Sequence, residues 1–268
     1  MRFTSISSGS SGNVSYIGTE RTHILVDAGV TMKAINEGLR TLELELSDIQ
    51  GIFLTHEHID HIKAIGAISR RYGIPIYGTL ETLQELISGN GQKKLGELDR
   101  ELLHPILPDA ESRIGDLSVL PFSIDHDAAN PVAYRVSDGV YSVAVATDMG
   151  HFDSYIEAHL RELDAMLIEA NHDIAMLSSG PYPMALKRRI LSDRGHLSND
   201  NAGRLLDRVL HDRLRHIFLG HLSLENNQPE LAKSTVEQEI DASESGYHSG
   251  DFEISVAKRD CVSELVVL

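Results

Sequence analysis

Four side chains that can bind metal ions lie within a stretch of six residues: His56, His58, Asp60 and His61. Such close spacing cannot place all four on one face of a regular helix or strand, whereas a loop that leaves a strand can turn them toward one point. Neutral imidazole rings suit zinc and other borderline transition metals, and a carboxylate suits harder ions. The alternative is a polar loop that is merely rich in histidine. A rigid strand before the loop and a helix after it favour the metal site.

The elements expected around this loop provide that rigidity. Ile52 to Leu54 form an apolar run bounded by polar residues, which predicts a buried strand running directly into the loop. Isoleucines then recur at helical spacing and predict a helix from about Ile62 to Tyr72. Polar residues also end four other apolar runs, at Asp27, Asp148, Glu169 and His221. The run before Asp148 predicts a strand from Val140 to Ala146. Sites in layered α/β proteins gather at such strand ends.

The composition indicates one acidic domain with a sizeable core. With 268 residues, 41% of them hydrophobic, we expect a single domain over residues 1–268. The net charge of −16 argues against binding to DNA or to an anionic membrane through charge alone. It does not exclude a nucleic-acid substrate, because bound divalent metals can reverse the sign of the charge locally.

The chain also lacks the signs of a secreted or membrane protein. Its apolar runs are too short to span a bilayer, so no membrane partner is expected. Cys261 is the only cysteine, which excludes an intramolecular disulfide. The N-terminal segment has no apolar core of the kind found in signal peptides. These features predict a cytoplasmic protein.

The spacing of His56, His58, Asp60 and His61 resembles the HxHxDH signature of the metallo-β-lactamase superfamily. The remaining motifs of that family match in order along nearly the whole chain, at Asp27, His126, Asp148 and His221. The resemblance implies an α+β or α/β fold, namely a four-layer αββα sandwich with two divalent metal ions at one edge. Zinc, manganese and iron all fit such a donor set.

The resemblance also implies a role for each matching residue. The implied ligands are His56, His58 and His126 for the first ion, Asp60, His61 and His221 for the second, and Asp148 as a bridge. A hydroxide between the metals would be the nucleophile, so Asp60 and Asp148 are candidate catalytic residues. Asp27 is expected to orient a ligand histidine through a hydrogen bond. No cysteine lies near these motifs, which argues against the thiolate-containing, antibiotic-hydrolysing members.

Four further segments resemble the YycJ/WalJ group of this superfamily: residues 8–13, 126–132, 169–173 and 195–199. Members of that group are regarded as DNA exonucleases that act from 5′ to 3′, so the resemblance implies a metal-dependent phosphodiesterase with DNA as its partner. One alternative is a small-molecule hydrolase for a thioester, lactone or cyclic phosphodiester, which the negative charge favours. Another is a non-catalytic binding protein, against which the intact ligand set argues.

Two groups of residues are candidates for contact with the substrate. His196 precedes a helix expected to begin near Ser198, where free N–H groups favour phosphate, and it can bind phosphate or protonate a leaving group. A basic stretch just upstream of it can hold a nucleic-acid backbone, at Lys187, Arg188, Arg189 and Arg194. A solvated helix face with an ordinary capping residue is the alternative interpretation of both.

Three more residues leave two interpretations open. Ser10 and Asn13 belong to a turn that can offer N–H groups to phosphate, although any hairpin turn contains such residues. His172 either lies near the site and contacts the substrate or is a structural hydrogen-bonding residue. His151 has no assigned role. Metal identity, exact substrate, polarity, strand preference, oligomeric state and protein partners are not readable from the sequence.

Overall fold

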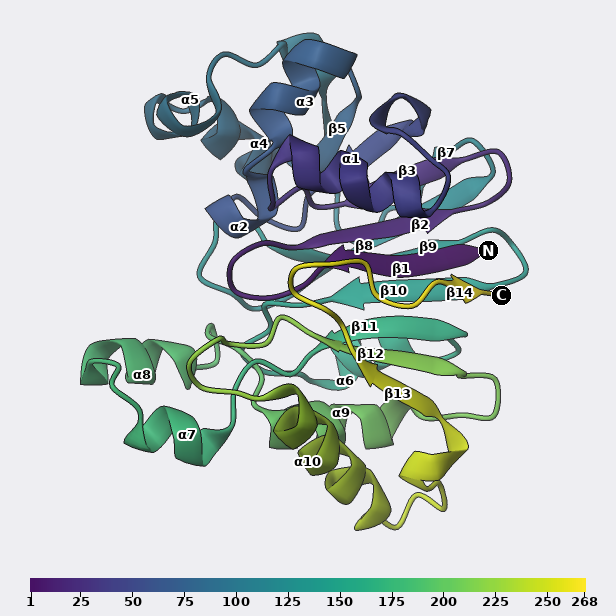
Figure 1. The fold of residues 1–268 in the computed structure, drawn as a ribbon, viewed down its shortest axis with the longest axis vertical. Helices are drawn as coiled ribbons and strands as arrows, with labels where there is room; N and C mark the ends of the chain where they lie inside the picture. Colours follow the sequence, from purple (N-terminus) through teal and green to yellow (C-terminus); the bar gives the residue numbers. More distant parts are fainter. The chain divides into compact units, whose positions relative to one another are not determined.

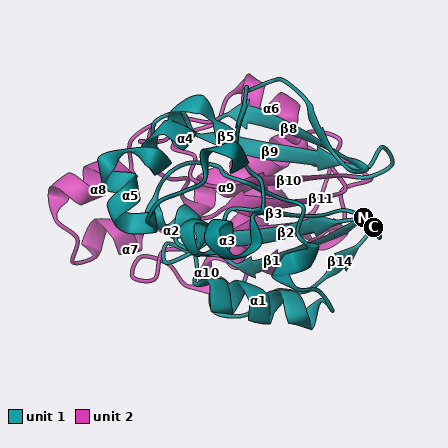
Figure 2. Ribbon diagram, turned by 90° about the horizontal axis from the view of Figure 1, so that it is seen from above, with its two compact units in different colours: residues 1–123, 128–141, 258–268 teal, residues 124–127, 142–257 magenta.

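The computed structural model describes residues 1–268, and the chain divides into two compact units (Figure 2). Unit 1 comprises Met1–Ser123, Ala128–Tyr141 and Lys258–Leu268, and unit 2 comprises Ile124–Asp127 and Ser142–Ala257. The single domain predicted for residues 1–268 stays a prediction. None of the helices is long and apolar enough to cross a membrane.

Unit 1 contains a mixed seven-stranded sheet with the order β14-β1-β2-β3-β4-β5-β6 (Figure 1). Its strands are β1 (Arg2–Ser7), β2 (Val14–Gly18), β3 (His23–Val26), β4 (Gly51–Phe53), β5 (Ile76–Thr79), β6 (Leu103–Ile106) and β14 (Val266–Val267). The strands from β14 to β3 pair antiparallel, and those from β3 to β6 pair parallel. Since Val26 pairs with Phe53, the carboxyl ends of β3 and β4 meet at one edge. Asp27 and the histidine-rich loop follow these two ends.

The remaining elements of unit 1 are three antiparallel strands and a set of short helices. The strands are β7 (Ser112–Ile114), β8 (Leu117–Ser123) and β9 (Val132–Ser137). The helices are α1 (Met32–Thr41), α2 (Ile59–Ile62), α3 (Ile65–Tyr72), α4 (Leu80–Ile87) and α5 (Gly89–Leu95), with 3₁₀ turns at Leu46–Asp48 and Arg100–Leu102. Apolar residues of α1 and α3 join those of β3 and β4 in one buried cluster, which fixes the sheet that carries the site.

Unit 2 is built on four parallel strands, so all their carboxyl ends lie at one edge (Figure 1). The strands are β10 (Ser142–Ala146), β11 (Ala165–Glu169), β12 (His216–Gly220) and β13 (Glu253–Val256). The helices are α6 (Ser154–Leu160), α7 (Ile174–Ser179), α8 (Met184–Ile190), α9 (Asn199–Val209) and α10 (Pro229–Asp241), with a 3₁₀ turn at Ser249–Asp251. Asp148, Glu169 and His221 follow or end three neighbouring strands at that edge.

Two predicted elements differ from the structure for local reasons. The single helix predicted from Ile62 to Tyr72 is interrupted between α2 and α3, because the Ala64 N–H donates to the Ala28 carbonyl oxygen at 2.9 Å. The strand predicted to start at Val140 starts at Ser142. The N–H groups of Val140 and Tyr141 are bound instead by the Asp138 carboxylate, at 2.9 and 2.8 Å, and form a turn.

Candidate metal centre

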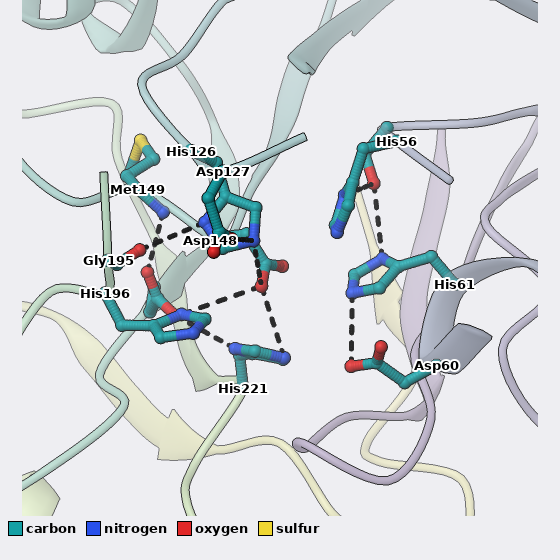
Figure 3. Close-up of polar contacts among 12 residues, drawn as sticks. His56, Asp60, His61, His126, Asp127, Asp148, Met149, Gly195, His196 and His221 are labelled. Atoms are coloured by element: carbon teal, nitrogen blue, oxygen red, sulfur yellow. Dashed lines mark hydrogen bonds and ion pairs between the residues drawn. The ribbon is translucent and has the colours of Figure 1, made fainter. Parts of the chain in front are cut away.

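The three imidazole rings of the histidine-rich loop converge in unit 1. His56 and His61 are fully buried, and their ring centroids are 4.2 Å apart. The ring of the half-buried His58 stands 4.5 Å from that of His56. Helix α2 begins directly after His58, and its turn brings Asp60 Oδ2 to 3.6 Å from His61 Nε2 (Figure 3). All four residues predicted from the spacing therefore lie together.

Asp27 orients the His61 ring. It follows β3 with a φ of 64°, in the left-handed region that residues other than glycine seldom adopt. Its Oδ2 accepts a hydrogen bond from His61 Nδ1 at 2.8 Å. Nδ1 therefore carries the proton, and Nε2 keeps the lone pair that a metal ion requires. Burial raises the pKa of the Asp27 carboxyl, while His61 and Thr55 act in the opposite direction.

Thr55 extends this arrangement to a second histidine, which the sequence did not predict. Its N–H donates to Asp27 Oδ1 and its hydroxyl donates to Asp27 Oδ2, both at 2.8 Å. With its proton used in this way, Thr55 Oγ1 can accept from His56 Nδ1 at 3.0 Å. The His56 ring then also has its proton on Nδ1, which leaves Nε2 unprotonated. The only signal in the sequence was a hydroxyl residue directly before the first histidine.

Backbone packing holds the loop against the start of the chain. The Asn13 N–H donates to the Asp60 carbonyl oxygen at 2.8 Å, and Asn13 Nδ2 lies 3.1 Å from His61 Nε2. A Cβ at Gly29 would lie 1.6 Å from the Asp60 carbonyl oxygen, so only glycine fits there. Asn13 thus contacts a candidate ligand directly. Ser10, in the same turn, is exposed.

Unit 2 holds a second group of donors in which every ligand atom lies within 4.8 Å of the others: Asp148, Glu169, His196 and His221. Asp148 Oδ1 is 3.5 Å from His221 Nε2 and 3.6 Å from His196 Nδ1 (Figure 3). Both Asp148 and His221 adopt positive φ, 61° and 55°, within two residues of the ends of their strands. Such strained conformations gather at functional sites, where the surrounding structure holds them.

Glu169 organises this second group, and its role was missed in the sequence. The carboxylate is fully buried at the end of β11. Its Oε1 accepts from His196 Nδ1 at 2.8 Å and from His221 Nδ1 at 2.9 Å, and its Oε2 accepts from the Met149 N–H at 2.8 Å. Burial raises the pKa of Glu169, but His196 and His221 outweigh burial and bring it down to about 2. The ionised carboxylate therefore holds both rings through Nδ1.

His126 is oriented by a carbonyl group instead of a carboxylate. Its Nδ1 lies 3.1 Å from the Gly195 carbonyl oxygen, an acceptor, so the ring donates from Nδ1. Its Nε2 lies 3.8 Å from Asp148 Oδ1. The candidate ligands of unit 2 therefore lie near one another. His126 has its proton on the nitrogen that faces away from Asp148, and the other two rings donate theirs to Glu169.

The basic stretch divides into residues with different contacts. Lys187 is buried and donates to the Ser178 carbonyl oxygen at 2.7 Å. Arg189 pairs with Asp127, and Arg194 donates to the His126 carbonyl oxygen at 3.2 Å. Arg188 is exposed. Arg188 is the one side chain of these four that is exposed and forms no hydrogen bond or ion pair.

The start of α9 is occupied by acceptors of the protein itself. Ser198 caps the helix and accepts from the Asn201 N–H at 3.2 Å. The Asn199 N–H donates to the His172 carbonyl oxygen at 2.9 Å, and the Leu197 N–H to Glu169 Oε2 at 3.2 Å. The helix begins where the sequence predicts. These three N–H groups are nevertheless already bound, which weakens the interpretation of the helix start as a phosphate site.

Two other histidines lie near this group. His172 is 1% exposed, and burial lowers its pKa to about 4, so the ring is neutral at pH 7. His151 contacts the Asp193 carbonyl oxygen through Nδ1 at 3.1 Å and Asp125 Oδ2 through Nε2 at 3.4 Å. Both nitrogens of His151 are therefore engaged by the loops that surround the candidate ligands.

The donor chemistry of both units fits divalent metal ions. Neutral imidazoles with their Nδ1 protons held by carboxylate, hydroxyl or carbonyl acceptors present Nε2, which is the arrangement typical of metal-binding histidines. Carboxylates stand beside them in each unit, at Asp60 and Asp148. The clusters indicate divalent metal binding, and nothing in them selects among zinc, manganese and iron.

Comparison with known proteins identifies the sequence and the fold. A family model for the "Beta-lactamase superfamily domain" matches residues 22–217. The chain is 36% identical over 255 residues to exodeoxyribonuclease YycJ of Bacillus anthracis, covering 95% of this chain and 94% of that protein. It is also 36% identical over 264 residues to exodeoxyribonuclease WalJ of Streptococcus pneumoniae, covering 98% and 97%.

A solved structure agrees with the sequence match. The metallo-β-lactamase fold protein YhfI from Bacillus subtilis is similar with a TM-score of 0.70 at 18% identity, over 98% of each chain. The fold class predicted from the sequence, the metallo-β-lactamase fold, is confirmed. So is the resemblance to the YycJ/WalJ group, which rested on residues outside the histidine-rich loop.

Thr55→Val should weaken zinc binding by about 10-fold, because the hydroxyl that fixes His56 and supports Asp27 is lost while the shape is kept. Thr55→Ser is the matched control, since it keeps the hydroxyl and should bind zinc like the wild type. Calorimetric titration of the metal-free proteins measures both. Equal affinities for the Val and Ser variants would contradict a role for the hydroxyl.

Glu169→Gln should lower metal affinity by about 10- to 100-fold, because an amide in place of the carboxylate cannot accept both Nδ1 protons as an anion does. Glu157→Gln removes another carboxylate of unit 2, one on α6 that pairs with Arg161, and serves as control. Competition against a coloured zinc chelator gives both affinities. A Glu169 variant that binds as tightly as the control would show that this carboxylate does not organise the site.

Proposed function

The chain belongs to the beta-lactamase superfamily, and we propose that it is a divalent-metal-dependent exodeoxyribonuclease that hydrolyses phosphodiester bonds at DNA ends. The observation that carries the proposal is the 36% identity to exodeoxyribonucleases over nearly the whole chain, in a sequence that keeps every donor of the family's motifs. Removal from the 5′ end is part of the same proposal.

The proposed ligands are those of the family pattern. His56, His58 and His126 would hold one metal ion, Asp60, His61 and His221 a second, and Asp148 would be shared by both. When bound, two such ions lower the pKa of water and stabilise the charge that develops on phosphate oxygens. Zinc or manganese is the proposed occupant, and iron also fits the donors. The proposal is supported in each unit by the way the imidazole protons are held.

Glu169 and His196 provide proton chemistry in this proposal. His196 donates from Nδ1 to the buried carboxylate at 2.8 Å, which fixes the orientation of the ring. A protonated ring would carry its second proton on Nε2, from which it can be given to the leaving oxygen of the cleaved strand. His196 would then act as the general acid, and Glu169 would position it.

Arg188 is the proposed contact to the nucleic-acid backbone. It lies on the exposed face of α8 and forms no ion pair, so its charge is available to phosphate. The chain has a net charge of −16, so attraction of DNA would depend on such local positive charge and not on the net charge of the protein. Contacts from Ser10, Asn13 and His172 to the substrate stay predictions. A cytoplasmic location, where DNA is the available substrate, completes the proposal.

A small-molecule hydrolase on the same scaffold is the second candidate, and the charge of −16 is the observation that favours it. An acidic surface repels a long polyanion more than it repels a small neutral ester or lactone. The two candidate functions differ in how strongly the affinity for substrate should depend on salt concentration. Several phosphate contacts give a steep fall of affinity with salt, and a neutral ester gives none.

Purified protein loaded with zinc, manganese or iron should shorten end-labelled DNA stepwise from the 5′ end. Single- and double-stranded substrates labelled at either end reveal polarity and strand preference on a denaturing gel. His58→Ala, which removes a proposed ligand, should leave the DNA intact and contain less metal. No shortening with any of the three metals would contradict the nuclease proposal and favour the small-molecule hydrolase, to be tried on thioester and phosphodiester substrates.

Arg188→Ala should reduce the salt dependence of DNA binding by about one unit in the slope of log K against log salt, because one phosphate contact is lost. Fluorescence anisotropy at a series of salt concentrations, with a cleavage-inactive His58→Ala background, gives the slope. Lys233→Ala removes an exposed charge on α10 and is the control. Equal slopes for Arg188→Ala and the control would exclude Arg188 as a backbone contact.

A further inference from the structure

We propose that Arg189 and Arg194 are positioning residues for His126, in place of the backbone contacts that the sequence predicted for them. The inference rests on the proposed function only in treating His126 as a metal ligand. It concerns a turn in unit 2, residues 189–196, which we call the clamp. The clamp contacts both the segment that contains His126 and the loop after Asp148.

Two consecutive residues of the clamp hold both parts of His126. Arg194 donates from its guanidinium to the His126 carbonyl oxygen at 3.2 Å. The next residue, Gly195, accepts from His126 Nδ1 at 3.1 Å through its own carbonyl oxygen (Figure 3). The first contact fixes the backbone and the second fixes the ring, so Nε2 is the nitrogen left to bind a metal.

Arg189 acts on the neighbouring carboxylate. Its Nε donates to Asp127 Oδ2 in a short charge-assisted hydrogen bond. The other carboxylate oxygen, Asp127 Oδ1, lies 3.4 Å from His126 Nε2. Without the arginine, the carboxylate could turn toward that nitrogen and accept a hydrogen bond from it, which favours the tautomer with the proton on Nε2 and so blocks metal binding there. The ion pair therefore keeps Asp127 in place as well as neutralising it.

Backbone hydrogen bonds and close packing hold the clamp in one conformation. The Gly195 N–H donates to the Ser192 carbonyl oxygen at 2.8 Å and the His196 N–H to the Ile190 carbonyl oxygen at 3.0 Å. A Cβ at Gly195 would lie 2.1 Å from the Ile190 carbonyl oxygen. The end of α8 is thus joined directly to His196.

The clamp also contacts the loop that follows Asp148. A Cβ at Gly150 would lie 2.1 Å from the Asp193 carbonyl oxygen, so the two backbones are in contact. His151 Nδ1 lies 3.1 Å from the same oxygen, and the Gly150 N–H donates to the Asp125 carbonyl oxygen at 2.9 Å. His151, which had no assigned role in the sequence, connects the clamp to the segment that contains His126.

The test measures zinc affinity of the metal-free protein without any DNA. Arg189→Ala and Arg194→Ala should each bind zinc about 10-fold more weakly, as is typical when a partner that orients a ligand is removed. Arg204→Ala is the matched control. It breaks an ion pair with Glu239 in the same unit, with side-chain exposures of 58% and 28%, against 54% and 32% for Arg189 and Asp127. It should bind zinc like the wild type.

A spectroscopic readout separates positioning from a general loss of stability. In the ¹⁵N NMR spectrum of the metal-free wild type, His126 should carry its proton on Nδ1. In Arg194→Ala that preference should weaken, and in Arg204→Ala it should not change. Arg189→Lys, which keeps the charge but loses the Nε donor, provides a second variant should Arg189→Ala fail to fold, and it should also bind zinc more weakly.

A contrary result would be equally easy to recognise in the zinc affinities. Arg189 and Arg194 variants that bind zinc as tightly as Arg204→Ala, with a lower salt slope for DNA, would overturn the inference and restore these residues as backbone contacts. Because zinc affinity is read without a substrate, the outcome does not depend on whether the protein degrades DNA. Failure of the nuclease proposal and failure of the clamp would therefore be told apart.

Discussion

Two buried carboxylates determine how the candidate metal centre is built, because a charge removed from water must receive hydrogen bonds from the protein. Asp27 in unit 1 and Glu169 in unit 2 obtain them from the Nδ1 atoms of histidines. The same bonds that stabilise the carboxylates select the tautomer of the rings and direct Nε2 toward a metal. One set of hydrogen bonds thus both stabilises the buried charge and orients the histidines for a metal ion.

That constraint explains the unusual backbone at the strand ends. Asp27 and His221 adopt positive φ immediately after a strand and Asp148 two residues after one, at a cost of about 1–2 kcal/mol for each such residue. Each conformation turns a side chain out of the alternating pattern of its strand and into the cluster. Parallel pairing brings the neighbouring strand ends to one edge, so the side chains that follow these ends come together, as Asp148 and His221 do in unit 2.

The sequence predicted what depends on local pattern and missed what depends on contacts across the sheet. The histidine spacing, the polar strand ends and the capping Ser198 are local signals, and the structure has these elements where they were expected. Thr55 and Glu169 were missed because their roles come from register, which sets Thr55 beside Asp27, 28 residues away. The pairing of Arg189 with Asp127 likewise joins residues 62 positions apart, which no run of basic residues reveals.

Two-bond ¹H–¹⁵N correlation NMR of the metal-free protein near neutral pH tests the central claim most directly, because it reports which nitrogen of each imidazole carries the proton. The account predicts protons on Nδ1 of His56, His61 and His221, with Nε2 unprotonated, before any metal is added. Rings protonated on Nε2, or exchanging between both tautomers, would contradict it. In that case the buried carboxylates would not be what prepares these histidines for a metal.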